Sequence, residues 1–207
     1  APLNRTQLML RTLLLLIIYC LTAPLILTPP RAWNSLTHRD RPPQQVALLK
    51  EIAAKPAIDD AFMHVPYEEQ GQWDFGVDVI TRFGFDWNHG RQDKSVHPFT
   101  TSFGVGDVRI TTRFDPERAA SALFSTMHEA GHAMYEQGIS RTLSRTPLAD
   151  GASMAIHESQ SRMWENLVGR SKAFWKFFYP MLQQKFPQQL KDVSLQQYYR
   201  GINKVEP

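Results

Sequence analysis

Apolar residues recur at helical spacing in several separate stretches of the chain. Residues 44–56 predict a short amphipathic helix, and residues 68–83 predict a second one. The longest stretch is residues 115–138, where Asp115 and Pro116 have the pattern of a helix start and no breaker follows until the final glycine. Apolar residues three or four positions apart predict its buried face: Ala119, Ala120, Leu123, Met127, Ala130 and Met134.

The remaining patterns predict one strand and further helices. Residues 105–114 alternate apolar and polar side chains, which indicates a strand, and residues 84–90 form a turn-rich loop before it. A helix capped by the segment Asp150-Gly151-Ala152-Ser153 should run to about Val168. Aromatic-rich helical pieces fill residues 171–205. The sequence therefore predicts a mainly α fold with a short edge strand or hairpin around residues 105–114.

The first 45 residues differ in composition from the rest. They contain no lysine, no glutamate, five arginines and one acidic residue, Asp40. The net charge of the whole chain is +3, so the other 162 residues, with 18 basic and 19 acidic groups, are close to neutral. This near-neutral charge gives no indication of a basic patch for binding nucleic acid. We expect an atypical hydrophobic and Arg/Pro-rich leader or linker over residues 1–45 and a folded domain over residues 46–207.

Residues 8–27 are the most apolar part of the leader. Their length is typical of a signal peptide and short of a confident membrane span, and Pro24 lies where processing would have to occur. We therefore expect a cytoplasmic protein, with anchoring or export through residues 8–27 as the alternative. A single cysteine, Cys20, excludes an intramolecular disulfide and a cysteine-based zinc site.

The candidate chemistry lies inside the longest predicted helix, in the sequence His128-Glu129-Ala130-Gly131-His132. Residues four apart share a helix face, so both imidazoles can bind one metal ion. Glu129 projects beside that ion and could accept a proton from metal-bound water. The H-E-x-x-H pattern is typical of zinc peptidases. A glycine inside a helix is unfavourable unless another element must pack closely against it.

A catalytic zinc site needs a third protein ligand. No further histidine follows His132 closely, so the ligand must come from elsewhere. Glu158 on the next predicted helix is the best candidate, and Glu165, seven residues on, is the fallback. Arg162 has the i+4 spacing to hold Glu158 in place, although an ordinary solvated ion pair has the same spacing.

Four linked motifs resemble the carboxypeptidase Taq family of metallocarboxypeptidases. They are His97-Pro98-Phe99, Asp107-Val108-Arg109-Ile110-Thr111, the HEAGH segment followed by Tyr135-Glu136-Gln137-Gly138, and His157-Glu158-Ser159-Gln160. The resemblance covers about residues 44–207, whereas a typical member is more than twice as long as this chain. It implies a gluzincin-type helical metallopeptidase core, here incomplete relative to the family, and release of single C-terminal residues from peptides.

The resemblance also implies roles for individual residues. The metal, Zn²⁺ or Co²⁺, would be bound by His128, His132 and Glu158, with Glu129 as general base. His97, Arg109 and Thr111 would line the substrate groove and bind the substrate. Arg162 and His157 would hold the metal ligands in place without binding the metal. Partners would be peptides with a free C-terminus, and a homodimer is compatible with the family.

Arg109 has two interpretations. The strand that carries it could pair with an extended peptide while its guanidinium binds a carboxylate. A structural ion pair with Asp107 would occupy the same guanidinium. Family motifs beyond the stretch that matches residues 202–207, including one that supplies a substrate-binding arginine, are absent from the sequence. A truncated non-catalytic remnant and a related HEXXH endopeptidase are therefore the alternatives to a metallocarboxypeptidase.

Overall fold

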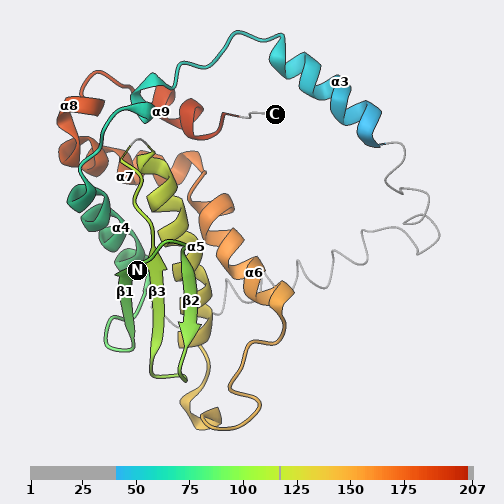
Figure 1. The fold of residues 1–207 in the computed structure, drawn as a ribbon, viewed down its shortest axis with the longest axis vertical. Coiled ribbons are helices and arrows are strands. Elements are labelled where there is room, and N and C mark those ends of the chain that lie inside the picture. Colours follow the sequence, from blue (N-terminus) through green and yellow to red (C-terminus); the bar gives the residue numbers. More distant parts are fainter. Residues whose placement is uncertain (1–40, 117, 205–207) are drawn as a thin grey trace, which may run out of the picture. The chain divides into compact units, whose positions relative to one another are not determined.

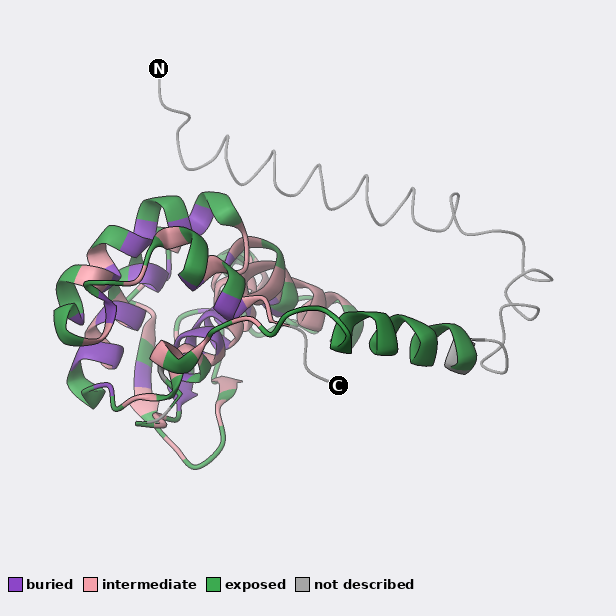
Figure 2. Cartoon of the chain, turned by 90° about the horizontal axis from the view of Figure 1, so that it is seen from above, coloured by how far each residue is buried: buried purple, intermediate pink, exposed green. Residues whose placement is uncertain are grey.

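The structure, a computed structural model, describes residues 41–116 and 118–204, and the chain divides into two units, residues 1–57 and 58–206. In the first unit, helix α3 (Arg41–Ala53) confirms the first predicted helix, and its described side chains are exposed (Figure 2). The predicted leader, with its apolar residues 8–27, lies almost entirely outside the described residues. None of the helices described has the length and apolar character needed to cross a membrane.

The second unit is mainly helical with one small sheet (Figure 1). In chain order its elements are η1 (Ala61–His64), α4 (Glu69–Phe83), β1 (Gly90–Lys94), β2 (Phe99–Ser102), β3 (Val108–Thr112), α5 (Ala119–Gln137), η2 (Arg141–Leu143), α6 (Met154–Arg162), η3 (Met163–Val168), α7 (Lys172–Lys185), α8 (Pro187–Leu190) and α9 (Leu195–Ile202). This agrees with the predicted mainly α class. In Figure 1, α5 lies behind the sheet with α4 and α6 on either side of it.

The sheet has the strand order β1-β3-β2, with β1 parallel and β2 antiparallel to β3. The prediction of a short edge strand or hairpin around residues 105–114 is confirmed as a hairpin, because β3 pairs antiparallel with β2. Since β1 pairs with the other edge of β3, that strand is central and not at the edge of the sheet. The two outer strands were not predicted because they lack apolar alternation. In β1 the only buried side chain is that of Gln92. The apolar residue in β2, Phe99, is exposed.

The two faces of the sheet have different environments. Thr100 in β2 pairs with Ile110 in β3, and both face α5: Ile110 is fully buried, and Thr100 contacts a residue of that helix. Successive strand residues point to opposite faces. Arg109 therefore lies on the face that points away from α5, where its side chain is exposed.

Helix α5 begins at Ala119, later than the start predicted at Asp115 and Pro116. Those two residues form a turn that is held by the segment leading into α4. The carbonyl of Pro116 accepts a hydrogen bond from the Tyr67 amide, and the carbonyl of Asp115 accepts one from the Arg118 amide. These long-range and turn contacts override the local helix-start pattern. The other end of the helix was predicted correctly, with Gly138 as its C-cap.

Helix α5 connects the two hydrophobic clusters of the unit. On one side Leu123 and Met127 pack into an aromatic-rich core with α4, α7 and α9, around the fully buried Trp175. On the other side Ala130 and Ala133 pack on the inner face of the sheet. Much of the predicted apolar face is therefore buried. These apolar contacts hold α5 in position between the aromatic core and the sheet.

Helix α6 approaches α5 at Gly131, the glycine of the HEAGH segment. A Cβ atom built on Gly131 would lie 2.6 Å from the Cα of Ser161 and 2.9 Å from the carbonyl oxygen of Gln160. Only a residue without a side chain allows this backbone approach, which explains why a glycine interrupts a helix that otherwise favours larger residues. The predicted helix over residues 150–168 forms as α6, capped by Ser153, followed by the wider π-helical turns of η3.

Replacing Gly131 by alanine should separate α5 from α6. Alanine gains roughly 1 kcal/mol in helix propensity, but the backbone overlap exceeds this gain, so we expect a net loss of about 2 kcal/mol in the free energy of unfolding. Gly76→Ala in α4 is the matched control, because its added Cβ would meet the Thr126 side chain at ordinary contact distance, with Cγ2 nearest at 3.4 Å. Urea titrations of both variants measure the difference. Equal stabilities would show that the close approach at Gly131 is not a constraint.

Candidate metal centre

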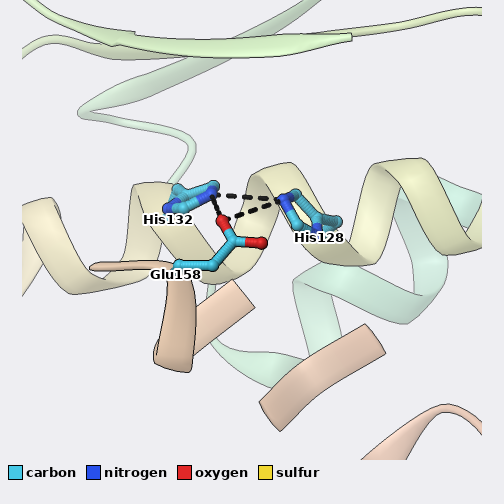
Figure 3. Close-up of side chains that lie close together, drawn as sticks. All are labelled: His128, His132 and Glu158. Carbon is cyan, nitrogen blue, oxygen red and sulfur yellow. Dashed lines mark hydrogen bonds and ion pairs between the residues drawn. The ribbon is translucent and has the colours of Figure 1, made fainter. Parts of the chain in front are cut away.

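His128, His132 and Glu158 converge at the contact between α5 and α6 (Figure 3). The Nε2 atoms of the two histidines are 3.2 Å apart. Glu158 Oε2 lies 3.3 Å from His132 Nε2 and 3.7 Å from His128 Nε2. The structure thus brings together the three residues that the sequence predicted as ligands. Two come from successive turns of α5, and the third comes from α6 because Gly131 allows that helix to lie so close.

The donor set fits a divalent transition metal such as zinc. Two imidazole nitrogens and one carboxylate oxygen are the three protein ligands typical of a catalytic zinc site. Tetrahedral bonds of about 2.0–2.1 Å place ligand atoms about 3.3 Å from one another, close to the separations of the three atoms here. The side chains are half-buried, and Arg162 Nε donates to the other oxygen of Glu158, 2.8 Å away.

Glu165 contacts the opposite nitrogen of His128. Its Oε2 lies 2.8 Å from His128 Nδ1, whereas the nitrogen that faces His132 and Glu158 is Nε2. The structure therefore does not bring Glu165, the fallback ligand, to the three converging atoms. Glu165 lies in the π-helical turns of η3 and, like Glu158, contacts both Arg162 and His128, but it reaches His128 from the Nδ1 side of the ring. A carboxylate on Nδ1 requires the proton there and leaves the Nε2 lone pair for a metal.

His132 is supported by a longer chain of contacts, which we term the imidazole chain: His132, His157 and Glu136. The Nδ1 atoms of His132 and His157 are 2.7 Å apart. The Nε2 atom of His157 is 2.6 Å from Oε1 of Glu136. Sequence reasoning predicted a supporting role for His157 but missed Glu136, because nothing in the local pattern shows that the two residues meet.

The surroundings shift the pKa values of the two histidines in opposite directions. The Glu165 carboxylate holds the pKa of His128 above its usual value, against the effect of burial. Burial, followed by the positive charge of His128, lowers the pKa of His132 to about 4. Burial would raise the pKa of Glu158, but the hydrogen bond from Arg162 and the nearby His128 hold it below the usual value. His132 and Glu158 are therefore in the metal-binding protonation state at neutral pH.

Glu129 lies on the side of α5 that faces the sheet, and it is only 7 % exposed. The Thr100 hydroxyl donates to Glu129 Oε2 at 2.6 Å, which ties the carboxylate to β2. Burial raises the pKa of Glu129, and the Thr100 hydrogen bond opposes that shift in part. Sequence reasoning missed Thr100, although it directly follows the His97-Pro98-Phe99 motif, because β2 was not predicted.

The three residues predicted to line a substrate groove have separate environments. Arg109 lies on the outer face of the sheet, where it forms a two-pronged ion pair with Asp107, at 2.8–2.9 Å, and stacks on Phe103. Because β3 is the central strand, it cannot pair with a peptide as the sequence suggested. The Thr111 hydroxyl accepts from the amide of Phe99, which fixes the turn that carries His97, whose side chain is exposed.

Most of the chain matches a known family. A model of the Carboxypeptidase Taq (M32) metallopeptidase family matches residues 43–207. The chain belongs to this family. The match begins and ends where the predicted resemblance does. It includes every residue of the candidate metal centre.

Individual M32 relatives agree with this assignment. Carboxypeptidase 1 of Bacillus subtilis is 44% identical over 165 residues, which are 78% of this chain and 32% of that protein. Thermostable carboxypeptidase 1 of Thermus thermophilus is 44% identical over 149 residues, 72% of this chain and 29% of that protein. The crystal structure of the M32 carboxypeptidase from Deinococcus radiodurans R1 superimposes with a TM-score of 0.75 at 45% identity, covering 78% of this chain and 32% of that one. The chain spans about a third of the length of the M32 proteins it matches.

The opposite pKa shifts predict different titrations of the two ligand histidines in metal-free protein. His132 should stay neutral until the pH falls to about 4, whereas His128 should gain its proton above 6.5. Because the unfolded chain protonates His132 more readily, His132 should destabilise the fold as the pH falls from about 6.5 towards 4. Titrating the imidazole signals by NMR checks this. Glu165→Gln should lower the pKa of His128 and leave that of His132 low, and joint titration near 6.5 in the parent chain would contradict the geometry.

Proposed function

We propose that residues 46–207 form the metal-binding part of an M32 metallocarboxypeptidase catalytic domain, which hydrolyses the C-terminal peptide bond of peptides. One observation carries this proposal: three metal-binding atoms from α5 and α6 meet beside the buried carboxylate of Glu129. The proposed substrates are peptides with a free C-terminus, acted on in the cytoplasm. No nucleic acid is involved.

His128, His132 and Glu158 would hold the metal, Zn²⁺ or Co²⁺. When bound, such an ion lowers the pKa of a coordinated water and polarises the carbonyl of the scissile bond. Arg162 keeps one oxygen of Glu158 engaged and so leaves Oε2 directed at the two imidazoles. The protein thus holds the three proposed ligands at separations compatible with one bound ion.

Glu129 would act as the general base. It would accept a proton from the attacking water and later deliver it to the departing amine nitrogen. Burial brings its pKa closer to neutral, which makes that return step easier, and the Thr100 hydroxyl fixes one carboxylate oxygen. The other oxygen remains available for the proton.

Recognition of the substrate's C-terminal carboxylate is a separate requirement. Arg109, the expected candidate, points away from α5 and is engaged by Asp107. Arg162 is bound to both Glu158 and Glu165. These pairings favour an endopeptidase as the second candidate function, since an enzyme that cleaves within a peptide needs no cation for a free carboxylate.

Loss of the Glu129 carboxylate should abolish turnover without loss of the metal. We expect Glu129→Gln to reduce the rate by at least about 100-fold, the usual effect of removing a general base. Zinc uptake should remain at one ion per chain. Hydrolysis is measured on the 207-residue chain with a peptide and with its C-terminal amide. The matched control is Glu51→Gln on the exposed helix α3.

Three outcomes separate the candidates. Cleavage of the free peptide alone supports a carboxypeptidase, and equal cleavage of the amide supports an endopeptidase. A chain that binds zinc and cleaves neither is a non-catalytic metal-binding fragment. Full activity of Glu129→Gln would refute the proposed role of Glu129.

A further inference from the structure

The two ligand histidines are supported from behind by carboxylates in different ways. His128 reaches Glu165 directly, and Arg162 also donates to that carboxylate, at 3.1 Å. His132 reaches a carboxylate only through a second imidazole, that of His157, and ends at Glu136. Glu136 is only 7 % exposed, and within the described part of the chain its one ion pair is with His157.

The positions of the protons in the imidazole chain follow from the contact between His157 and Glu136 at its end. An ionised carboxylate can only accept hydrogen bonds, so His157 must carry a proton on Nε2, the atom that faces Glu136. In neutral His157 the other nitrogen, Nδ1, is then an acceptor. That atom lies 2.7 Å from His132 Nδ1, which must therefore donate. A neutral His132 with its proton on Nδ1 has a free lone pair on Nε2, the atom that faces Glu158.

The His157 ring has little freedom to turn away from this arrangement. Tyr135 packs against it edge to face, with ring centres 5.0 Å apart, and the His132 ring lies 4.8 Å away. On another side a Cβ atom on Gly151 would come within 2.8 Å of the His157 ring. The ring therefore fits a space built from α5 and the loop before α6.

We propose that Glu136 is a positioning residue for the metal site, which acts through His157 to fix the proton of His132 on Nδ1 and leave Nε2 free for the ion. This inference rests on the proposed function for the identity of the site. The inference concerns Glu136, a residue outside the proposed ligand set, which lies on the turn of α5 that follows His132. Outer hydrogen-bond partners of ligand histidines set ligand orientation and commonly change metal affinity by about 10-fold to 100-fold.

The proton positions can be measured without metal and without any variant. Long-range proton–nitrogen NMR spectra of the metal-free 207-residue chain distinguish the two neutral forms of each histidine. We expect the proton on Nδ1 in His128 and His132 and on Nε2 in His157. A proton on Nε2 of His132, or two protons on His157, would overturn the proposal.

Glu136→Gln tests the effect on metal binding with almost no change in shape. An amide can also donate, so His157 can adopt its other neutral form and reverse the bond to His132, which places a proton on the metal-facing Nε2. We expect zinc affinity, measured by competition with a chelator, to fall about 10-fold to 100-fold. Glu51→Gln should have no effect. Affinity within about twofold of the parent chain would refute the role of Glu136.

A combined variant shows whether Glu136 acts through His157. His157→Phe should weaken zinc binding by itself, and adding Glu136→Gln to it should cause no further loss, since the path is already broken. Additive losses would contradict the proposed path. If the parent chain takes up no zinc, the proposed function fails, whereas the proton positions in the metal-free chain still decide the role of Glu136.

Discussion

The backbone contact between Gly131 and Ser161 is the constraint on which the metal centre depends. The H-E-x-x-H spacing places two imidazoles on one face of α5, but Glu158, the proposed third ligand, lies 26 residues beyond His132 on another helix. It reaches the imidazoles only because α6 lies against α5 at a distance that excludes a Cβ atom. The burial of α5 between an aromatic core and the sheet makes that helix a rigid platform for the contact. Packing of α5 against α6 thus brings the three side chains together.

Polar contacts then determine how the assembled groups can be used. Each ligand histidine has an acidic residue behind it, and each contact favours a lone pair on the nitrogen that faces the other ligands. Glu129 faces the sheet, where the Thr100 hydroxyl of β2 holds it, and its carboxylate still interacts electrostatically with His128 and Glu158. The sheet therefore contributes to the site through an outer strand that holds the proposed base, while Arg109 on the central strand lies on the opposite face.

Sequence reasoning succeeded where the chemistry is local. Helical spacing within α5 predicted the histidine pair, its buried face and the need for a glycine that packs closely, and the helix that carries Glu158 was also predicted. The outer strands could not be predicted, because their pairing with β3 comes from residues distant in sequence. The early helix start failed for the same reason, since Tyr67 holds Pro116 in a turn. Glu136 and Glu165 required knowledge of where α5 meets α6 and η3.

The most direct test of this account is X-ray absorption at the zinc edge of the zinc-loaded chain. The account predicts nitrogen and oxygen neighbours at about 2.0–2.1 Å, outer scattering from two imidazoles, and no sulfur. The outer scattering should fall to that of a single imidazole in His132→Ala. A zinc ion with a sulfur neighbour, an all-oxygen shell or scattering from fewer than two imidazoles in the parent chain would contradict the assembly of His128, His132 and Glu158 into one metal site.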